Sequence, residues 1–105
     1  MAFEGYSCIS VEVSDGVAHA TLDHPPINLF DVTLMGEVDR LGREIEADNS
    51  VRVVVFQSAN PEFFIAHADV TLIQRLPTEV PPKSEALGFF HQLVDRFRTM
   101  PKVSI

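Results

Sequence analysis

"RVVVFQSANPEFFIAHADV", Arg52 to Val70, joins a run of valines to an unusually apolar loop. The valine run is continuous, which is typical of a strand that is covered on both faces in a parallel sheet. In the loop, Phe63, Phe64 and Ile65 come before two alanines that flank a histidine. We expect these three large residues to anchor the loop to the body of the protein, so that the backbone behind them is held rigid.

The segments before this stretch predict a β-hairpin. Alternating apolar residues in Ser7–Val13 and Val17–Asp23 predict two half-buried strands. The Asp-Gly pair between them supplies the positive φ angles of a tight antiparallel turn. Two prolines in "HPPINLF", from 24 to 30, end the second strand, because proline cannot donate to a ladder.

A helix should follow this loop. Asp31 is a good N-cap, and apolar residues recur after it at helical spacing until about Ala47. Gly36 and Gly42 lower the helix propensity, so either tertiary packing holds the helix or close helix contacts require the glycines. Strand, helix and strand in this order predict a right-handed crossover and an α/β fold.

The segments after the loop predict two further elements. Thr71–Pro77 suggests a short turn of helix, and the proline-containing Thr78–Lys83 suggests an exposed linker. From the capping Ser84 to Met100, a broad apolar stripe predicts a well-buried helix. Lys102–Ile105 has the pattern of the start of another buried strand.

Composition narrows the class of protein. The 105 residues suffice for one small domain, and an apolar fraction of 46% with 22% charged residues is typical of a globular chain. The net charge of −7 argues against nucleic acid and anionic membranes as partners. The single Cys8 cannot form an internal disulfide, which favours a reducing, cytoplasmic location. We find no signal peptide and no stretch long enough to span a bilayer.

Outside the loop, few residues have the spacing of a catalytic or metal-binding site. The four histidines are scattered without metal-ligand spacing, so no metal is expected. Cys8 has no base near it in the sequence, and the adjacent Asp23 and His24 should point to opposite faces. This leaves the loop after the valine run. There, small residues let a ligand approach the backbone, whose N–H groups can form half of an oxyanion hole. The alternative is an apolar loop that simply plugs the core.

Four motifs occur in an order that resembles one known family. "VAHATLDHPPINLF", "ADNSVRVVVFQS", "FFIAHADV" and "MPKVSI" are similar, in order and spacing, to motifs of the enoyl-CoA hydratase/isomerase (crotonase) family. The resemblance covers nearly the whole chain, from about Ser7 to Ile105. It implies the family's ββα superhelix, with residues 1–105 as the N-terminal part of a crotonase-like domain and the C-terminal part of the fold absent from this chain.

The resemblance also implies roles for individual residues. The backbone N–H of Ala68 would be one oxyanion-hole donor, and carbonyls around Ala66 and Ala68 would receive the adenine amino group of coenzyme A. His67 stands where the family has glycine, and whether its imidazole enters the site or turns aside is left open. The implied substrate- and coenzyme A-binding residues are Ile27, Asn28, Leu29, Ala66, His67, Asp69 and Val70.

The activity implied by the resemblance is that of an acyl-CoA enzyme, a lyase or isomerase of fatty acid metabolism, that stabilises a thioester enolate. Hydration, isomerisation, decarboxylation and hydrolysis stay open, because the family's acid/base residues lie beyond Ile105. No cofactor is expected to be bound permanently. The full-length protein should form trimers or hexamers, and the 105-residue chain alone should be inactive. The alternatives are a non-catalytic α/β module that binds coenzyme A or a partner, and an interaction domain without a ligand.

Overall fold

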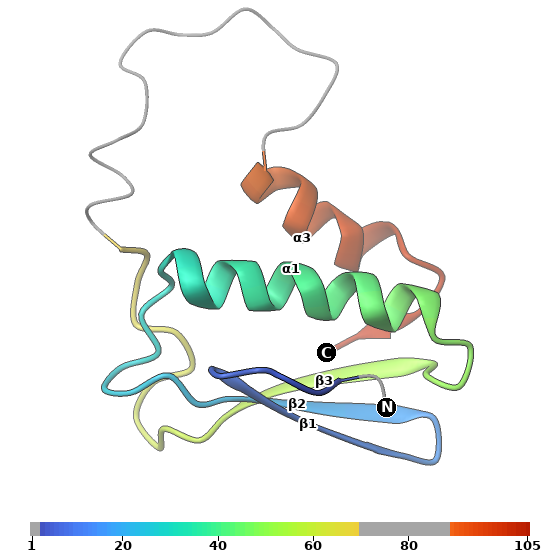
Figure 1. Ribbon diagram of the computed structural model, residues 1–105, viewed down its shortest axis with the longest axis horizontal. Helices are drawn as coiled ribbons and strands as arrows, with labels where there is room; N and C mark the ends of the chain where they lie inside the picture. Colours follow the sequence, from blue (N-terminus) through green and yellow to red (C-terminus); the bar gives the residue numbers. More distant parts are fainter. Residues whose placement is uncertain (1–2, 70–88) are drawn as a thin grey trace, which may run out of the picture.

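In the part of the chain that the structure describes, one mixed four-stranded sheet carries two helices on the same side (Figure 1). The computed structural model describes residues 3–69 and 89–105, so the predictions for Val70 and for the segments from 71 to 88 lie outside the described residues. None of the described helices is both long and apolar enough to cross a membrane. The elements in chain order are β1 Ile9–Ser14, β2 Val17–Leu22, α1 Val32–Ala47, β3 Val53–Ser58, α3 Phe89–Thr99 and β4 Val103–Ser104.

The predicted hairpin is confirmed. β1 pairs with β2 in antiparallel register, with Ile9 opposite Leu22 and Ser14 opposite Val17. Asp15 and Gly16 between the strands have φ angles of 53° and 79°. Two consecutive positive φ angles match the twist of the flanking strands, which is why Asp-Gly is favoured at this turn.

The strand–helix–strand unit gives the sheet its parallel part. β3 pairs with β2 in parallel, from Val17 opposite Val53 to Leu22 opposite Ser58. β4 continues the sheet in parallel beyond β3, with Val103 beside Val53. The sheet order is therefore β1-β2-β3-β4, and the predicted α/β fold is confirmed.

Helix α1 is capped at both ends by residues that fix its position. The Asp31 carboxylate accepts a hydrogen bond from the Leu34 N–H at 2.9 Å, as the N-cap prediction requires. At the other end, the Lys102 ammonium donates to the carbonyls of Ile45 and Asp48. A cation is favourable at the negative end of a helix, so this contact also ties the segment before β4 to α1.

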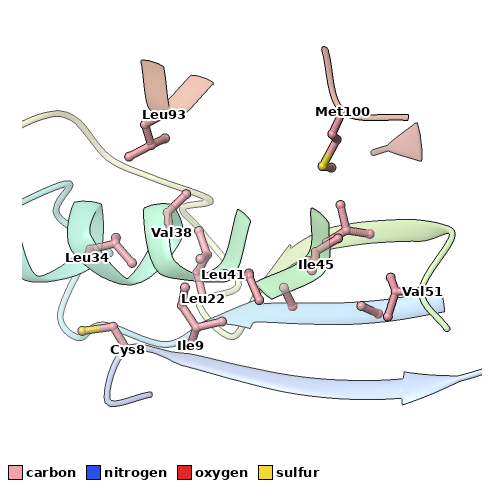
Figure 2. Close-up of a cluster of buried hydrophobic side chains, with 13 residues drawn as sticks. Cys8, Ile9, Leu22, Leu34, Val38, Leu41, Ile45, Val51, Leu93 and Met100 are labelled. Atoms are coloured by element: carbon pink, nitrogen blue, oxygen red, sulfur yellow. The ribbon is translucent and has the colours of Figure 1, made fainter. Parts of the chain in front are cut away.

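The core lies between one face of the sheet and the helices (Figure 2). Ala18, Ala20 and Leu22 point into it from β2, while His19 between them is exposed. The prediction that β3 is covered on both faces is wrong for the described residues. Only Val54 of that strand is buried, and its outer face carries polar contacts such as Gln57 to Thr21. The core comprises Cys8, Ile9, Ala18, Ala20, Leu22, Leu34, Val38, Leu41, Ile45, Val51, Val54, Leu93 and Met100.

The two helices meet closely at Gly42. A Cβ atom built there would lie 3.0 Å from the Phe97 ring of α3, whereas one at Gly36 would meet nothing within 4 Å. Phe97 also packs edge-on against Phe56 of β3, with ring centroids 5.3 Å apart. The close-contact explanation therefore holds for Gly42 and not for Gly36. The stripe of α3 is narrower than predicted, because Val94 is exposed.

Candidate functional site

The loop after β3 is fastened to the loop after β2 by an isolated parallel bridge between Phe30 and Ala68. The Phe30 N–H donates to the His67 carbonyl at 3.0 Å, and the Asp69 N–H donates to the Phe30 carbonyl at 3.1 Å. Both bonds are made by the residues on either side of Ala68. The backbone of the predicted site is thus held as a short piece of strand.

This bridge leaves the N–H of Ala68 pointing away from Phe30. In a parallel bridge the flanking residues make the hydrogen bonds, so the N–H and C=O of the central residue face the opposite edge. Ala68 is exposed, and no described residue accepts a hydrogen bond from its N–H. The carbonyl of the same peptide unit, that of His67, accepts from Phe30, and such polarisation strengthens the N–H as a donor. Ala68 therefore presents a fixed and accessible donor.

His67 lies beside this donor. Its side chain is exposed, and its Nδ1 lies 2.7 Å from the Ala68 carbonyl oxygen. Because a carbonyl oxygen can only accept, Nδ1 is the donor in this bond. The imidazole therefore folds along the loop and stays next to Ala68. That His67 contacts a ligand stays a prediction.

Asn28 is a buried support of the site. Its side chain is 2% exposed, and its φ of 53° is a left-handed conformation that asparagine tolerates. The amide oxygen accepts from the His24 N–H at 2.9 Å, and the amide nitrogen donates to Ser58 Oγ and to the Phe64 carbonyl, both at 2.8 Å. The Asn28 side chain thus joins the end of β3 and the two loops, and it supports the backbone of the predicted site.

The other residues predicted from the loop after β2 lie beside this support. Ile27 and Leu29 are half-buried. The Ile27 carbonyl accepts from the Ala66 N–H at 3.3 Å, which adds a further tie between the two loops. The structure therefore brings Ile27 next to Ala66. The role of Ile27, Asn28 and Leu29 in coenzyme A binding stays a prediction.

The two phenylalanines do not anchor the loop by burial, which corrects the sequence-based expectation. Phe63 and Phe64 are 41% and 51% exposed, and only Ile65 packs against the core. Their backbone does the anchoring instead. The Phe63 carbonyl accepts from Ser58 Oγ at 2.7 Å, and the Phe64 carbonyl accepts from Asn28. Hydrophobicity alone could not reveal this, because the contacts depend on polar partners elsewhere in the chain.

An apolar cavity of about 320 Å³ lies next to the loop. It is walled by the sheet, by the two loops and by α3, and its lining suits hydrocarbon better than charge. The lining includes Phe30, Phe64, Ile65, Leu93, Phe97 and Ile105.

A second group of polar side chains connects Cys8, His24 and Asp31. Cys8 Sγ lies 3.2 Å from His24 Nδ1, and His24 Nε2 lies 2.8 Å from the Asp31 carboxylate. The sequence-based view that Cys8 has no base nearby is therefore wrong, since the fold brings together residues that are 16 positions apart. Cys8 is only 2% exposed, however, while His24 and Asp31 are half-buried, so this partly buried relay joins the residue before β1 to the start of α1.

The ionisation of this relay fits a structural role. Burial raises the pKa of the Cys8 thiol, which disfavours the reactive thiolate. Burial also opposes ionisation of Asp31, but hydrogen bonds from the His24 ring and the Leu34 N–H outweigh it and hold the pKa of Asp31 below its usual value. Within residues 3–69 and 89–105, no group of three or more His, Cys, Asp or Glu side chains could hold a metal ion.

Comparison with known proteins places this fold in one class, the crotonase-like α/β proteins. A structure from Streptomyces avermitilis, assigned as an enoyl-CoA hydratase, matches 95% of the chain at 36% identity with a TM-score of 0.72. An enoyl-CoA hydratase/carnithine racemase structure from Magnetospirillum magneticum matches 97% of the chain at 19% identity with a TM-score of 0.75, which supports the fold. No family model matches the chain.

A curated relative agrees with these structures. The fatty acid oxidation complex subunit alpha of Idiomarina loihiensis is 39% identical over 74 residues, which is 69% of the chain. The chain belongs to the enoyl-CoA hydratase/isomerase (crotonase) family. It spans 38% of the Streptomyces protein, 39% of the Magnetospirillum protein and 10% of the Idiomarina protein.

Proposed function

We propose that this chain supplies part of the thioester site of an acyl-CoA enzyme of the enoyl-CoA hydratase/isomerase type. In this site the N–H of Ala68 donates to the thioester carbonyl and stabilises the enolate that forms from it. The observation that carries the proposal is the exposed Ala68 N–H, held between the two hydrogen bonds to Phe30. A donor fixed in advance stabilises developing charge without the cost of reorganisation.

A cavity lined in part by Phe30, the bridge partner of Ala68, supports the proposal. The apolar cavity beside the loop offers the nonpolar surface that an acyl chain requires. Coenzyme A is the substrate carrier in this proposal, and no permanently bound cofactor is needed. We further propose a cytoplasmic protein that acts as an oligomer in fatty acid metabolism. The acid/base groups that decide between hydration and isomerisation are proposed to lie outside these 105 residues, so that the chain alone turns over no substrate.

The proposal is tested with butyryl-CoA that carries ¹³C at the thioester carbonyl. Calorimetry gives the affinity, and infrared spectroscopy gives the carbonyl stretch, which shifts to lower frequency when a donor polarises the carbonyl. Ala68→Pro removes the N–H, and Ala68→Gly keeps it as a matched control. We expect Ala68→Pro to abolish the shift and to weaken binding by about tenfold, while Ala68→Gly keeps both.

Circular dichroism verifies that each variant is folded. If proline perturbs the fold, a semisynthetic chain with an ester in place of the peptide N–H of Ala68 removes the same donor. An undiminished carbonyl shift in a folded variant without this N–H would refute the oxyanion role. Binding without turnover by a full-length protein that contains these 105 residues would favour the alternative of a non-catalytic module that binds coenzyme A.

A further inference from the structure

One ring nitrogen of the His67 imidazole already makes a hydrogen bond, and the other can still accept one. Nδ1 donates to the Ala68 carbonyl, and in a neutral imidazole this leaves Nε2 with a lone pair that accepts hydrogen bonds. The side chain is exposed, and none of the described residues bonds to Nε2. In its neutral form His67 therefore offers an acceptor, oriented by the bond to Ala68, at the surface of the loop.

This acceptor lies on the same edge of the loop as the Ala68 donor. In an extended segment, the N–H and C=O of one residue point to the same side. The Ala68 carbonyl holds the imidazole, so the ring lies on the side that carries the available Ala68 N–H. One edge of the loop thus presents a backbone donor followed by a side-chain acceptor. A ligand with a carbonyl oxygen and a nearby N–H group is complementary to this pair.

We propose that His67 is a ligand-binding residue whose Nε2 accepts a hydrogen bond from an N–H group of the ligand that Ala68 holds by its carbonyl. This inference rests on the proposed function and names a second contact within the same site. An acyl-CoA has two sources of such a group, the amide N–H groups of its pantetheine arm and the amino group of its adenine. The shared chemistry is an uncharged N–H donor, and truncated ligands distinguish the two sources.

Two substitutions separate the two nitrogens of His67. In His67→Asn the amide nitrogen takes the place of Nδ1 and can still donate to the Ala68 carbonyl, but no atom replaces Nε2. In His67→Gln the longer side chain places an amide oxygen near the position of Nε2, where it can accept. His67→Ala removes both contacts. Because the side chain is exposed, none of these changes should unfold the chain, which circular dichroism verifies.

The affinities for butyryl-CoA and for butyryl-pantetheine, which lacks adenine and the diphosphate, provide the test. We expect His67→Asn and His67→Ala to weaken binding by about three- to tenfold, and His67→Gln to stay within about twofold of the wild type. A loss with both ligands identifies the pantetheine amides as the donors, whereas a loss with butyryl-CoA alone identifies adenine. Both results support the inference.

Two results would overturn it, and they are distinguishable. If the wild type binds butyryl-CoA with the Ala68-dependent carbonyl shift, but His67→Asn and His67→Ala bind equally well, the proposed function stands and the role of His67 falls. If the wild type binds neither ligand, both proposals fall together.

Discussion

Asn28 is the residue at which one substitution should affect both the fold and the site. Its side chain makes three hydrogen bonds from a position that is 2% exposed, and it reaches the end of β3 and both loops. In Asn28→Ala, the His24 N–H and the Phe64 carbonyl lose their partners. Ser58 Oγ keeps other bonds, including the one to the Phe63 carbonyl. The loss of stability in Asn28→Ala is therefore determined by these two polar groups, which are left without partners.

The expected loss follows from these two groups and from the backbone. A buried polar group without a partner costs about 1–3 kcal/mol, and both groups here are partly accessible to water, so about 2–4 kcal/mol in total is reasonable. The left-handed φ of 53° adds about 1 kcal/mol for alanine. Asn28→Ala should thus lose about 3–5 kcal/mol, a large part of the 5–15 kcal/mol that stabilises a typical domain.

Urea denaturation followed by circular dichroism measures this loss, with two controls. Asn28→Gly lacks the side-chain bonds but accepts the left-handed φ, so it should be about 1 kcal/mol more stable than Asn28→Ala. Asn49→Ala, at an exposed asparagine, should change stability by less than about 0.5 kcal/mol. A loss below about 1 kcal/mol in Asn28→Ala would show that the three bonds do not support the loops as described.

Two further outcomes follow from α1. Gly36→Ala should raise the free energy of unfolding, measured by urea denaturation, by about 1 kcal/mol, because a methyl group there meets nothing. Gly42→Ala should be less stable than Gly36→Ala by about 1–3 kcal/mol, because its new methyl group meets α3. Equal stabilities would contradict the close helix contact. The pKa of Asp31 is lowered in the folded state, so its contribution is present above the unfolded pKa and is lost as the pH falls below about 4. Asp31→Asn should lower stability at pH 7 and flatten the acid limb of the profile, and an unchanged acid limb would argue against this role.

The sequence predicted the elements whose signals are local. The Asp15-Gly16 turn and the Asp31 cap depend on residues within a few positions of one another, so alternation and capping rules suffice for the hairpin and for α1. The faces of β3 were not predictable in this way. An apolar run shows that a strand is compatible with burial, but it does not show which face the rest of the chain covers.

The candidate site also has one part that local sequence signals predict and another part that they do not. The stretch from Ala66 to Asp69 could be singled out by its small residues and by family resemblance, because those features lie within the stretch itself. The support by Asn28 could not, since its partners Ser58 and Phe64 are 30 and 36 residues away. The relay of Cys8 with His24 escaped sequence analysis for the same reason. Pairings between distant polar residues leave no periodic signal in a single sequence.

The bridge between Phe30 and Ala68 has a consequence for the length of the loop. Along an extended segment the N–H groups alternate between the two edges, so a shift of one residue exchanges the edge that each of them faces. Deleting one residue between Ser58 and Ala66 would place Asp69 opposite Phe30, and inserting one would place His67 there. Either change would turn the Ala68 N–H inward. The spacing of this loop is thus a stricter requirement than the identity of its exposed side chains, and variants of this chain should tolerate replacements there far better than changes in length.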